Sequence, residues 1–180
     1  MGIGAWLRFN LQRKVSAAKF PPLGDRSYGA RRAVDFLGRR YHSTANRDSL
    51  LILQVESKEA VAIADELVAI EGVDGLFLGP DDLLVRDGQD VETPKDSTSL
   101  GKQYKTVVDA CRRHGKLSMG HGINDASLQM AREYGYNLVI GGGDVGFLAN
   151  GSKNSAQKLR KYFDGFSLPG VAGTSGGNRP

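Results

Sequence analysis

From residue 50 onward, short apolar runs alternate with stretches of helical periodicity, and this alternation constrains the fold more than any other feature. The apolar runs occupy residues 50–55, 75–79, 116–119 and 137–140. Strands that are each followed by a helix need crossover connections, which indicates an α/β fold with a parallel sheet. The sheet can be doubly wound or part of a barrel. About four β/α units are too few for a complete eight-stranded barrel, which typically needs about 250 residues.

Helix signals separate these runs. The clearest helix is predicted over 100–114, where apolar residues recur on one face and Gly115 supplies the stop. Further helices are predicted from the N-cap Ser57 to Gly72, over 125–134 before Gly135, and over 155–163. The polar stretch 85–97 is predicted to be a long loop. The tail from residue 165 is rich in Gly, Ser and Pro, and we expect it to be disordered.

The first 49 residues show no strand signal and are basic. Residues 1–48 hold ten Lys or Arg and three acidic residues. The segment lacks the interleaved aromatic residues of single-strand binders and every common nucleic-acid-binding motif. We therefore expect a solvated or subunit-facing arm and no nucleic-acid partner.

Composition also indicates in which cellular compartment the protein is expected. No apolar run approaches the roughly 20 residues of a membrane span, so no membrane association is expected. The single cysteine, Cys111, excludes an internal disulfide and suits a reducing compartment, which favours the cytoplasm. Residues 1–20 contain no acid, and a mitochondrial presequence is the alternative interpretation of that segment.

Two acids follow neighbouring strands and form the first candidate site. Glu56 closes the first strand, and Asp82 lies just past Gly79-Pro80 at the end of the second. Ligands bind at the carboxyl ends of parallel strands, and adjacent strands lie about 4.8 Å apart. Glu56 and Asp82 are therefore candidate ligands for one hard cation such as Mg²⁺ or Mn²⁺. Gln54 precedes Glu56 by two residues and points to the same face. The structural alternative is that both acids merely cap helices.

Other reactive residues give weaker signals. The segment 141–144 is rich in glycine and is a candidate anion cradle, with a plain strand-to-loop turn as the alternative. His121 is the only histidine expected at the strand ends, and no Ser or Cys partner identifies a nucleophile. Cys111 belongs to an apolar helix face and is expected to be a buried core thiol.

Four ordered strings resemble one family. They are Gln54-Val55-Glu56-Ser57, the segment 72–83 (GVDGLFLGPDDL), the upstream loop 19–29 (KFPPLGDRSYG) and the segment 135–144 (GYNLVIGGGD). Each is weak alone, but in this order they resemble the HpcH/HpaI aldolase family, over about residues 15–165. Residues 1–14 show no resemblance. The family's R-G-x-G has become Arg26-Ser27-Tyr28-Gly29, and the loop after Leu83 is unlike the usual short one.

The resemblance implies an eight-stranded (β/α)8 barrel of the TIM type, of which this chain holds the C-terminal half. The expected parts are a basic N-terminal arm with the Pro-Pro loop at 1–49, a partial barrel with the metal site at 50–165, and a disordered tail at 166–180. The family is commonly hexameric and exchanges a C-terminal helix between subunits, so a homo-oligomer is expected.

The resemblance also implies roles for residues. Glu56 and Asp82 would bind the divalent metal, Mg²⁺ or Mn²⁺ first and Co²⁺ or Zn²⁺ as alternatives. Gln54 would face the bound pyruvate, and the backbone of Gly79, Pro80, Asp81 and Asp82 would hold its carboxylate. The implied partners are pyruvate or another 2-oxo acid and an aldehyde.

The implied activity is that of a class II pyruvate aldolase, a carbon–carbon lyase that cleaves or forms 4-hydroxy-2-oxo acids. The family's catalytic histidine and a substrate-clamping arginine belong to the first half of the barrel, which this sequence does not contain. The catalytic base is therefore unassigned, with His121 the replacement candidate, and weak or no activity is expected. The alternative is a non-catalytic paralogue that binds a metal or an oxo acid, or that acts only through association.

Overall fold

The computed structural model describes residues 3–29, 31–93, 95 and 99–163, and the side chains from residue 9 onward. The chain divides into two compact units, Met1–Gly141 and Gly142–Pro180. The first unit contains the sheet and the candidate site. No described helix has the length and apolar character needed to cross a bilayer.

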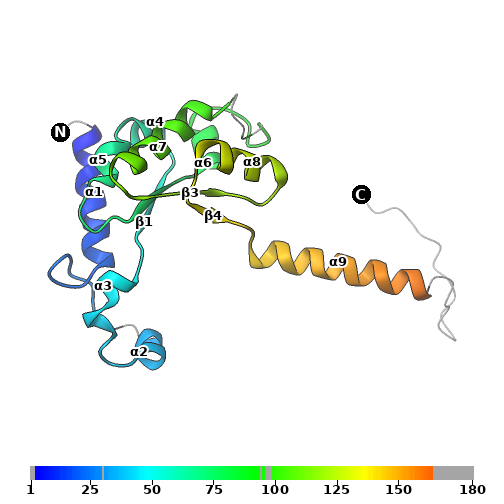
Figure 1. The fold of residues 1–180 in the computed structure, drawn as a ribbon, viewed down its shortest axis with the longest axis horizontal. Helices are drawn as coiled ribbons and strands as arrows, with labels where there is room; N and C mark the ends of the chain where they lie inside the picture. Colours follow the sequence, from blue (N-terminus) through cyan, green and yellow to red (C-terminus); the bar gives the residue numbers. More distant parts are fainter. Residues whose placement is uncertain (1–2, 30, 94, 96–98, 164–180) are drawn as a thin grey trace. The chain divides into compact units, whose positions relative to one another are not determined.

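Four parallel strands form one sheet in the first unit (Figure 1). The strands are β1 (Ile52–Val55), β2 (Gly75–Leu78), β3 (Leu117–His121) and β4 (Leu138–Ile140), and they lie in sequence order. All three pairings are parallel, with Val55 opposite Leu78 and Met119 opposite Leu138. The predicted α/β class, the four strands and their parallel direction are confirmed.

Helices cover one face of this sheet (Figure 1). Helix α7 packs over β2 and β3, α8 packs on β3, and α1 packs against α4 and α5. These helices are α1 (Ile3–Ala18), α4 (Lys58–Ala62), α5 (Ala64–Val68), α7 (Gly101–Arg113) and α8 (Asp125–Tyr134). Two shorter helices and a 3-10 turn precede β1, namely α2 (Arg31–Leu37), η1 (Tyr41–Ser43) and α3 (Ala45–Asp48).

Alternation along the strands decides which side chains are buried. Leu53, Val55, Leu76 and Leu78 are at most 5% exposed beneath the helices. Each such side chain stabilises the fold by about 1.5–3 kcal/mol relative to an exposed one. The residues between them point to the opposite face, where Gln54 is exposed and its register neighbour Phe77 is half-buried. The strands thus lie between a well-packed helix layer and a second face whose residues stay partly accessible.

Several element boundaries differ from the sequence-based expectation. The helix predicted from Ser57 to Gly72 is two helices, because Ile63 leaves helical geometry at φ −110° and ψ 22°. The last helix, α9 (Asp144–Phe163), begins well before the predicted residue 155. A short helix, α6 (Pro80–Arg86), takes the first residues of the predicted 85–97 loop. Helix α8 has the predicted bounds and ends at Gly135 in the left-handed conformation. The predicted disordered tail lies outside the described residues.

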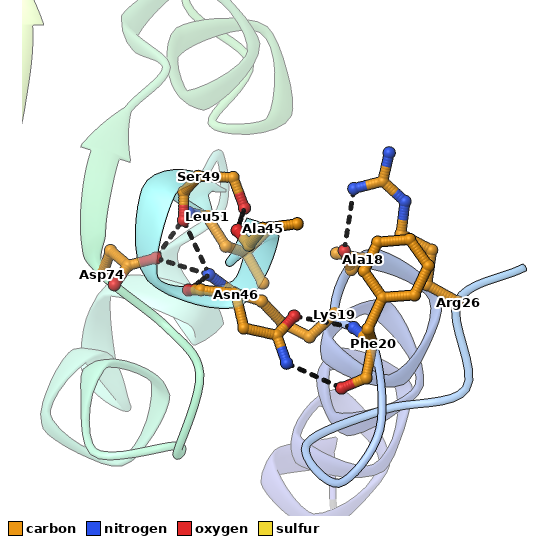
Figure 2. Close-up of polar contacts among 9 residues, drawn as sticks. All are labelled: Ala18, Lys19, Phe20, Arg26, Ala45, Asn46, Ser49, Leu51 and Asp74. Atoms are coloured by element: carbon orange, nitrogen blue, oxygen red, sulfur yellow. Dashed lines mark hydrogen bonds and ion pairs between the residues drawn. The ribbon is translucent and has the colours of Figure 1, made fainter. Parts of the chain in front are cut away.

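A buried lysine joins the N-terminal segment to the amino ends of β1 and β2 (Figure 2). The Lys19 side chain is 2% exposed and its Nζ donates to the Ser49 carbonyl at 2.8 Å and the Asn46 carbonyl at 3.2 Å. It also pairs with the Asp74 carboxylate at 3.1 Å, which accepts the Leu51 backbone N–H at 2.7 Å. Because the Lys19 ammonium group donates to three acceptors, its charge is tolerated inside the protein.

Neighbouring residues stabilise the same contact between the N-terminal segment and the sheet. The Asn46 side chain accepts from the Phe20 backbone N–H and donates to the Phe20 carbonyl, both at 2.7 Å. The Arg26 guanidinium lies over the Phe20 ring, 5.0 Å from its centroid. Figure 2 draws both side chains beside the Asn46 contacts. The Pro-Pro loop is therefore fixed at the amino end of the sheet, opposite to Glu56. In parallel β/α barrels, residues at this end contribute to stability, and residues at the carboxyl end carry the active site.

Replacing Lys19 by methionine should destabilise the chain, because Asp74 and two backbone carbonyls would lose a buried cation. Breaking a buried ion pair by removing one partner costs about 3–5 kcal/mol. Urea unfolding followed by circular dichroism measures the change. Lys14→Met, at an exposed position of α1, is the matched control. Equal unfolding midpoints for the two variants would show that the pair contributes nothing.

Candidate functional site

The candidate ligands sit where β1 and β2 end. Glu56 follows β1 directly and is half-buried, and Ser57 then caps α4 by accepting the Ala60 N–H at 3.2 Å. At the next strand, the Gly79 N–H donates to the Val55 carbonyl at 2.9 Å and Pro80 begins α6. Asp82 lies in the first turn of that helix and is exposed. The two carboxylates thus follow hydrogen-bonded strands at the same edge of the sheet.

Gly79 allows the side chains of β1 to cross over β2. A Cβ atom at this position would lie 2.8 Å from Glu56 Cγ and 2.9 Å from Gln54 Nε2. Both side chains therefore lean onto the Gly79 backbone and lie next to each other. The arrangement requires a residue without a side chain at position 79, because real Cβ atoms do not approach other atoms so closely.

The donor set is small. No group of three or more His, Cys, Asp or Glu side chains gathers in the part of the chain that the structure describes. Glu56 and Asp82 offer two carboxylates, and Gln54 adds an amide beside Glu56. Hard divalent ions such as Mg²⁺ accept one or two protein carboxylates and fill the other positions with water and substrate oxygens. The residues present fit such an ion, and a thiolate zinc site is not available here.

Two ion pairs tether the polar segment after α6 to this edge. Lys58, two residues after Glu56, pairs with Asp87, and the hydrogen bond from Lys58 holds the pKa of Asp87 below its usual range. Lys95 pairs with Asp81 at 3.0 Å, directly beside Asp82. Two described residues of this stretch, Asp87 and Lys95, are thereby each bound close in sequence to a candidate metal ligand.

The structure places His121 at the same edge, and no ion pair or hydrogen bond of its ring is found among the described residues. It ends β3, is half-buried, and its ring meets the Phe77 ring edge-on at 5.0 Å between centroids. Cys111 is buried in the core as expected, and burial raises the pKa of its thiol. The candidate anion cradle at 141–144 adjoins α9, where the Gly143 carbonyl accepts the Phe147 N–H at 2.9 Å.

Sequence analysis missed a cavity of about 500 Å³, whose described lining includes Pro80 but neither Glu56 nor Asp82. Pro80 and His121 connect it to the sheet edge, while Glu92 and Lys95 line it from the polar segment and Tyr104 from α7. Burial, with a contribution from the charge of Asp81, raises the pKa of Tyr104 to about 12. Polarity around 85–97 was the only signal of this cavity in the sequence, because the contacts that form it join separate elements.

Comparison with known proteins agrees with this arrangement. The model of the family described as HpcH/HpaI aldolase/citrate lyase matches residues 10–150, most of the chain. The chain belongs to this family. The match begins upstream of residue 15 and ends before residue 165, so part of the segment that showed no motif belongs to the family as well.

Individual relatives are named aldolases. The chain is 34% identical to a hydroxypyruvate/pyruvate aldolase of Roseovarius nubinhibens over 152 residues, 81% of this chain and 57% of that protein. It is 34% identical to a 2-keto-3-deoxy-L-rhamnonate aldolase of Salmonella schwarzengrund over 146 residues, 73% of this chain and 49% of that protein. The chain thus spans about half the length of these curated relatives.

A solved structure supports the fold. A HpcH/HpaI aldolase/citrate lyase family protein from Burkholderia cenocepacia superposes with a TM-score of 0.68 at 30% identity. The match covers 85% of this chain and 61% of that one. The four β/α units therefore correspond to part of a (β/α)8 barrel, as the resemblance implied.

Adding a methyl group at Gly79 should disturb the site locally. In Gly79→Ala the new Cβ would push Gln54 and Glu56 away, and overpacking of this kind costs about 1–3 kcal/mol. The change is measured as a lower unfolding free energy in urea and as a shifted NMR signal of the Gln54 side-chain amide. Gly141→Ala is the control, because a Cβ there meets nothing within 4 Å. An unmoved Gln54 signal would contradict the described packing.

Proposed function

We propose that the chain carries the metal- and 2-oxo-acid-binding part of a class II pyruvate aldolase. The observation that carries the proposal is the joint packing of Gln54 and Glu56 over Gly79, which is followed three residues later by Asp82 in the first turn of α6. Family membership and the aldolase names of the relatives support this reading of the geometry.

A divalent ion held by Glu56 and Asp82, Mg²⁺ or Mn²⁺ first and Co²⁺ or Zn²⁺ as alternatives, would supply Lewis-acid stabilisation of the enolate of a 2-oxo acid. The protein groups bind and orient the substrate. The Gln54 amide can donate to a substrate oxygen, and the backbone N–H groups of Asp81 and Asp82, in the first turn of α6, suit a carboxylate. Together these contacts would hold pyruvate so that its methyl carbon is free to react with an aldehyde.

For proton transfer, the described part of the chain offers no clearly positioned base. Efficient aldol cleavage needs a base positioned near the reacting hydroxyl, and such help is worth typically 10²–10⁴ in rate. His121 is the histidine at the carboxyl edge in the described part of the chain, and its ring rests against Phe77. A binding protein without turnover is therefore the second candidate function.

We also propose that the chain associates with itself in the cytoplasm. Helix α9 exposes the apolar side chains of Val145, Phe147 and Leu148, which a second copy of the chain would cover. Exposed apolar side chains that gather on one helix are typical of a protein–protein contact surface. No role for nucleic acid or membrane is proposed.

The metal site predicts that Mn²⁺ binds to the purified chain and enhances water-proton relaxation. Removing both carboxylates in Glu56→Ala, Asp82→Ala should weaken Mn²⁺ binding at least about tenfold, because hard ions need oxygen ligands of this kind. The control is Glu71→Ala, Asp48→Ala, which removes two exposed acids near the amino ends of the strands. Equal Mn²⁺ affinity in both double variants would sink the proposed site.

The missing base predicts slow turnover by the 180-residue chain alone. Cleavage of a 4-hydroxy-2-oxo acid, followed by coupling released pyruvate to lactate dehydrogenase, should proceed far below the median enzyme rate of about 10 s⁻¹. Any residual rate should vanish in Glu56→Ala. A rate near that median, lost in both Glu56→Ala and His121→Ala, would prove this expectation wrong and identify His121 as the base.

A further inference from the structure

The face of the sheet that is turned away from the helices is apolar and only partly covered. Register partners point to the same side, so the four strands present one shared set of side chains there. The apolar members of this set are all half-buried, whereas the alternate residues of β1 and β2 are buried beneath the helices. They form what we call the open face: Ile52, Phe77, Leu117, Met119, Leu138 and Ile140. Sheets whose strands all run parallel normally have both faces covered, so the open face is expected to be a contact surface.

The two outer strands of the sheet carry free backbone edges. In the described part of the chain, β1 pairs with β2 alone and β4 with β3 alone. The carbonyls of Leu51 and Val55 each accept, at 2.9 Å, one of the N–H groups that flank β2. The backbone groups of the alternate residues Ile52 and Gln54 therefore point away from β2, toward the free edge. Edges of this kind pair readily with a further strand.

Helix α1 also indicates that a further strand belongs beside β1. Among the described elements α1 has no strand of its own, yet it packs against α4 and α5, the helices that follow β1. It lies at the end of the helix layer next to β1 (Figure 1), and its Phe9 is 55% exposed. Because helices of a parallel β/α sheet cover strands, α1 extends the helix layer toward the free edge of β1.

A second copy of the chain supplies what both edges require. All four strands run in the same direction, so β1 of one copy can pair in parallel with β4 of another. A two-fold axis along the strands then repeats the same joint on the opposite side and leaves no free edge. The eight strands that result are the number in a (β/α)8 barrel, to which the four β/α units correspond. The interior of an eight-stranded barrel is filled by bulky apolar side chains such as those of the open face.

We propose that two copies of the chain close one eight-stranded barrel, in which β1 of each copy pairs with β4 of the other and the two open faces form a shared core. This contact is separate from the one proposed for α9. Its consequence for the site rests on the proposed aldolase function. In the closed barrel, β4 of the second copy lies beside Gln54, which is exposed in the single sheet. The carboxyl ends of all eight strands surround one mouth, which holds the Glu56 and Asp82 side chains of both copies.

Sedimentation of the purified full chain at micromolar concentration tests the closure. The wild type should form a dimer or a multiple of a dimer. Met119→Lys places a cation in the middle of the open face and should weaken the dimer at least about tenfold, because closure would bury that charge without a partner. Val85→Lys makes the matched change at an exposed apolar position of α6 and should leave the dimer unaltered. A monomeric wild type, or a Met119→Lys variant that dimerises as well as Val85→Lys, overturns the proposal.

A second variant acts on the edge instead of the face. Ile52→Pro removes an N–H that points away from β2, so it should weaken the dimer without breaking a hydrogen bond inside the sheet. Circular dichroism checks that each variant is folded, and Ile52→Pro decides the matter if Met119→Lys is not. A folded Ile52→Pro variant that dimerises like the wild type contradicts pairing through β1.

Hydrogen exchange in the wild type distinguishes edge pairing from simple stacking of the two faces. When the concentration is raised until most of the chain is dimeric, the Gln54 amide should exchange at least about tenfold more slowly, because it gains a strand partner. The Leu53 amide, which points toward β2, is the internal control and should change little. Gln54 exchange that is independent of concentration refutes the proposed joint.

The outcomes separate this inference from the proposed function. Mn²⁺ should broaden the NMR signal of Gly79 in a Glu56-dependent way if the metal site is correct. If it does so in a monomeric wild type, the closure is refuted and the metal site stands. If the dimer passes the tests above while Mn²⁺ leaves Gly79 unchanged, the closure stands and the proposed function falls.

Discussion

The Lys19–Asp74 ion pair is the contact on which the rest of the first unit depends. Its two residues are 55 positions apart, and together they join the end of α1, one carbonyl within α3 and one just after it, and the residues that directly precede β1 and β2. A buried ammonium group is stable only when it is fully hydrogen-bonded, so each of these segments must be in place at once. The pair therefore fixes where β1 and β2 begin, and the hydrogen-bonded register carries that position along to Glu56 and Gly79.

The carboxyl ends of the same strands obey a steric constraint instead. Gly79 has no side chain, and this absence lets Gln54 of β1 and Glu56, which follows β1, lie against the backbone at the end of β2. A short-range packing rule thus brings together an amide and a carboxylate at Gly79, three residues before Asp82 in the chain. Such a site is held by the backbone, which suits groups that must stay available to an ion and a substrate.

Local patterns predicted much of this architecture. Apolar runs gave the four parallel strands, and Gly135 gave the end of α8, because burial and a left-handed backbone are properties of single positions. The order of Gln54, Glu56 and Asp82 predicted candidate ligands at one edge; the three residues lie in or just after β1 and in the helix after β2, and their role as ligands stays a prediction. The sequence could not predict the Lys19 network or the Asp81–Lys95 pair, because long-range contacts have no periodicity. It also missed the break at Ile63 and the early start of α9, where tertiary packing and helix extension override weak propensities.

The two ends of the sheet are held by ion pairs of different character. Lys19 is 2% exposed, whereas Lys58 is 61% exposed and Asp81 67%. Dissolved ions screen exposed charges over about 8 Å at physiological strength and over about 3 Å at 1 M, while a buried pair is screened much less. Concentrated salt would therefore loosen the polar segment above the carboxyl edge and leave the amino edge intact. Ionic strength would therefore change access to the carboxyl end of the sheet without unfolding the amino end.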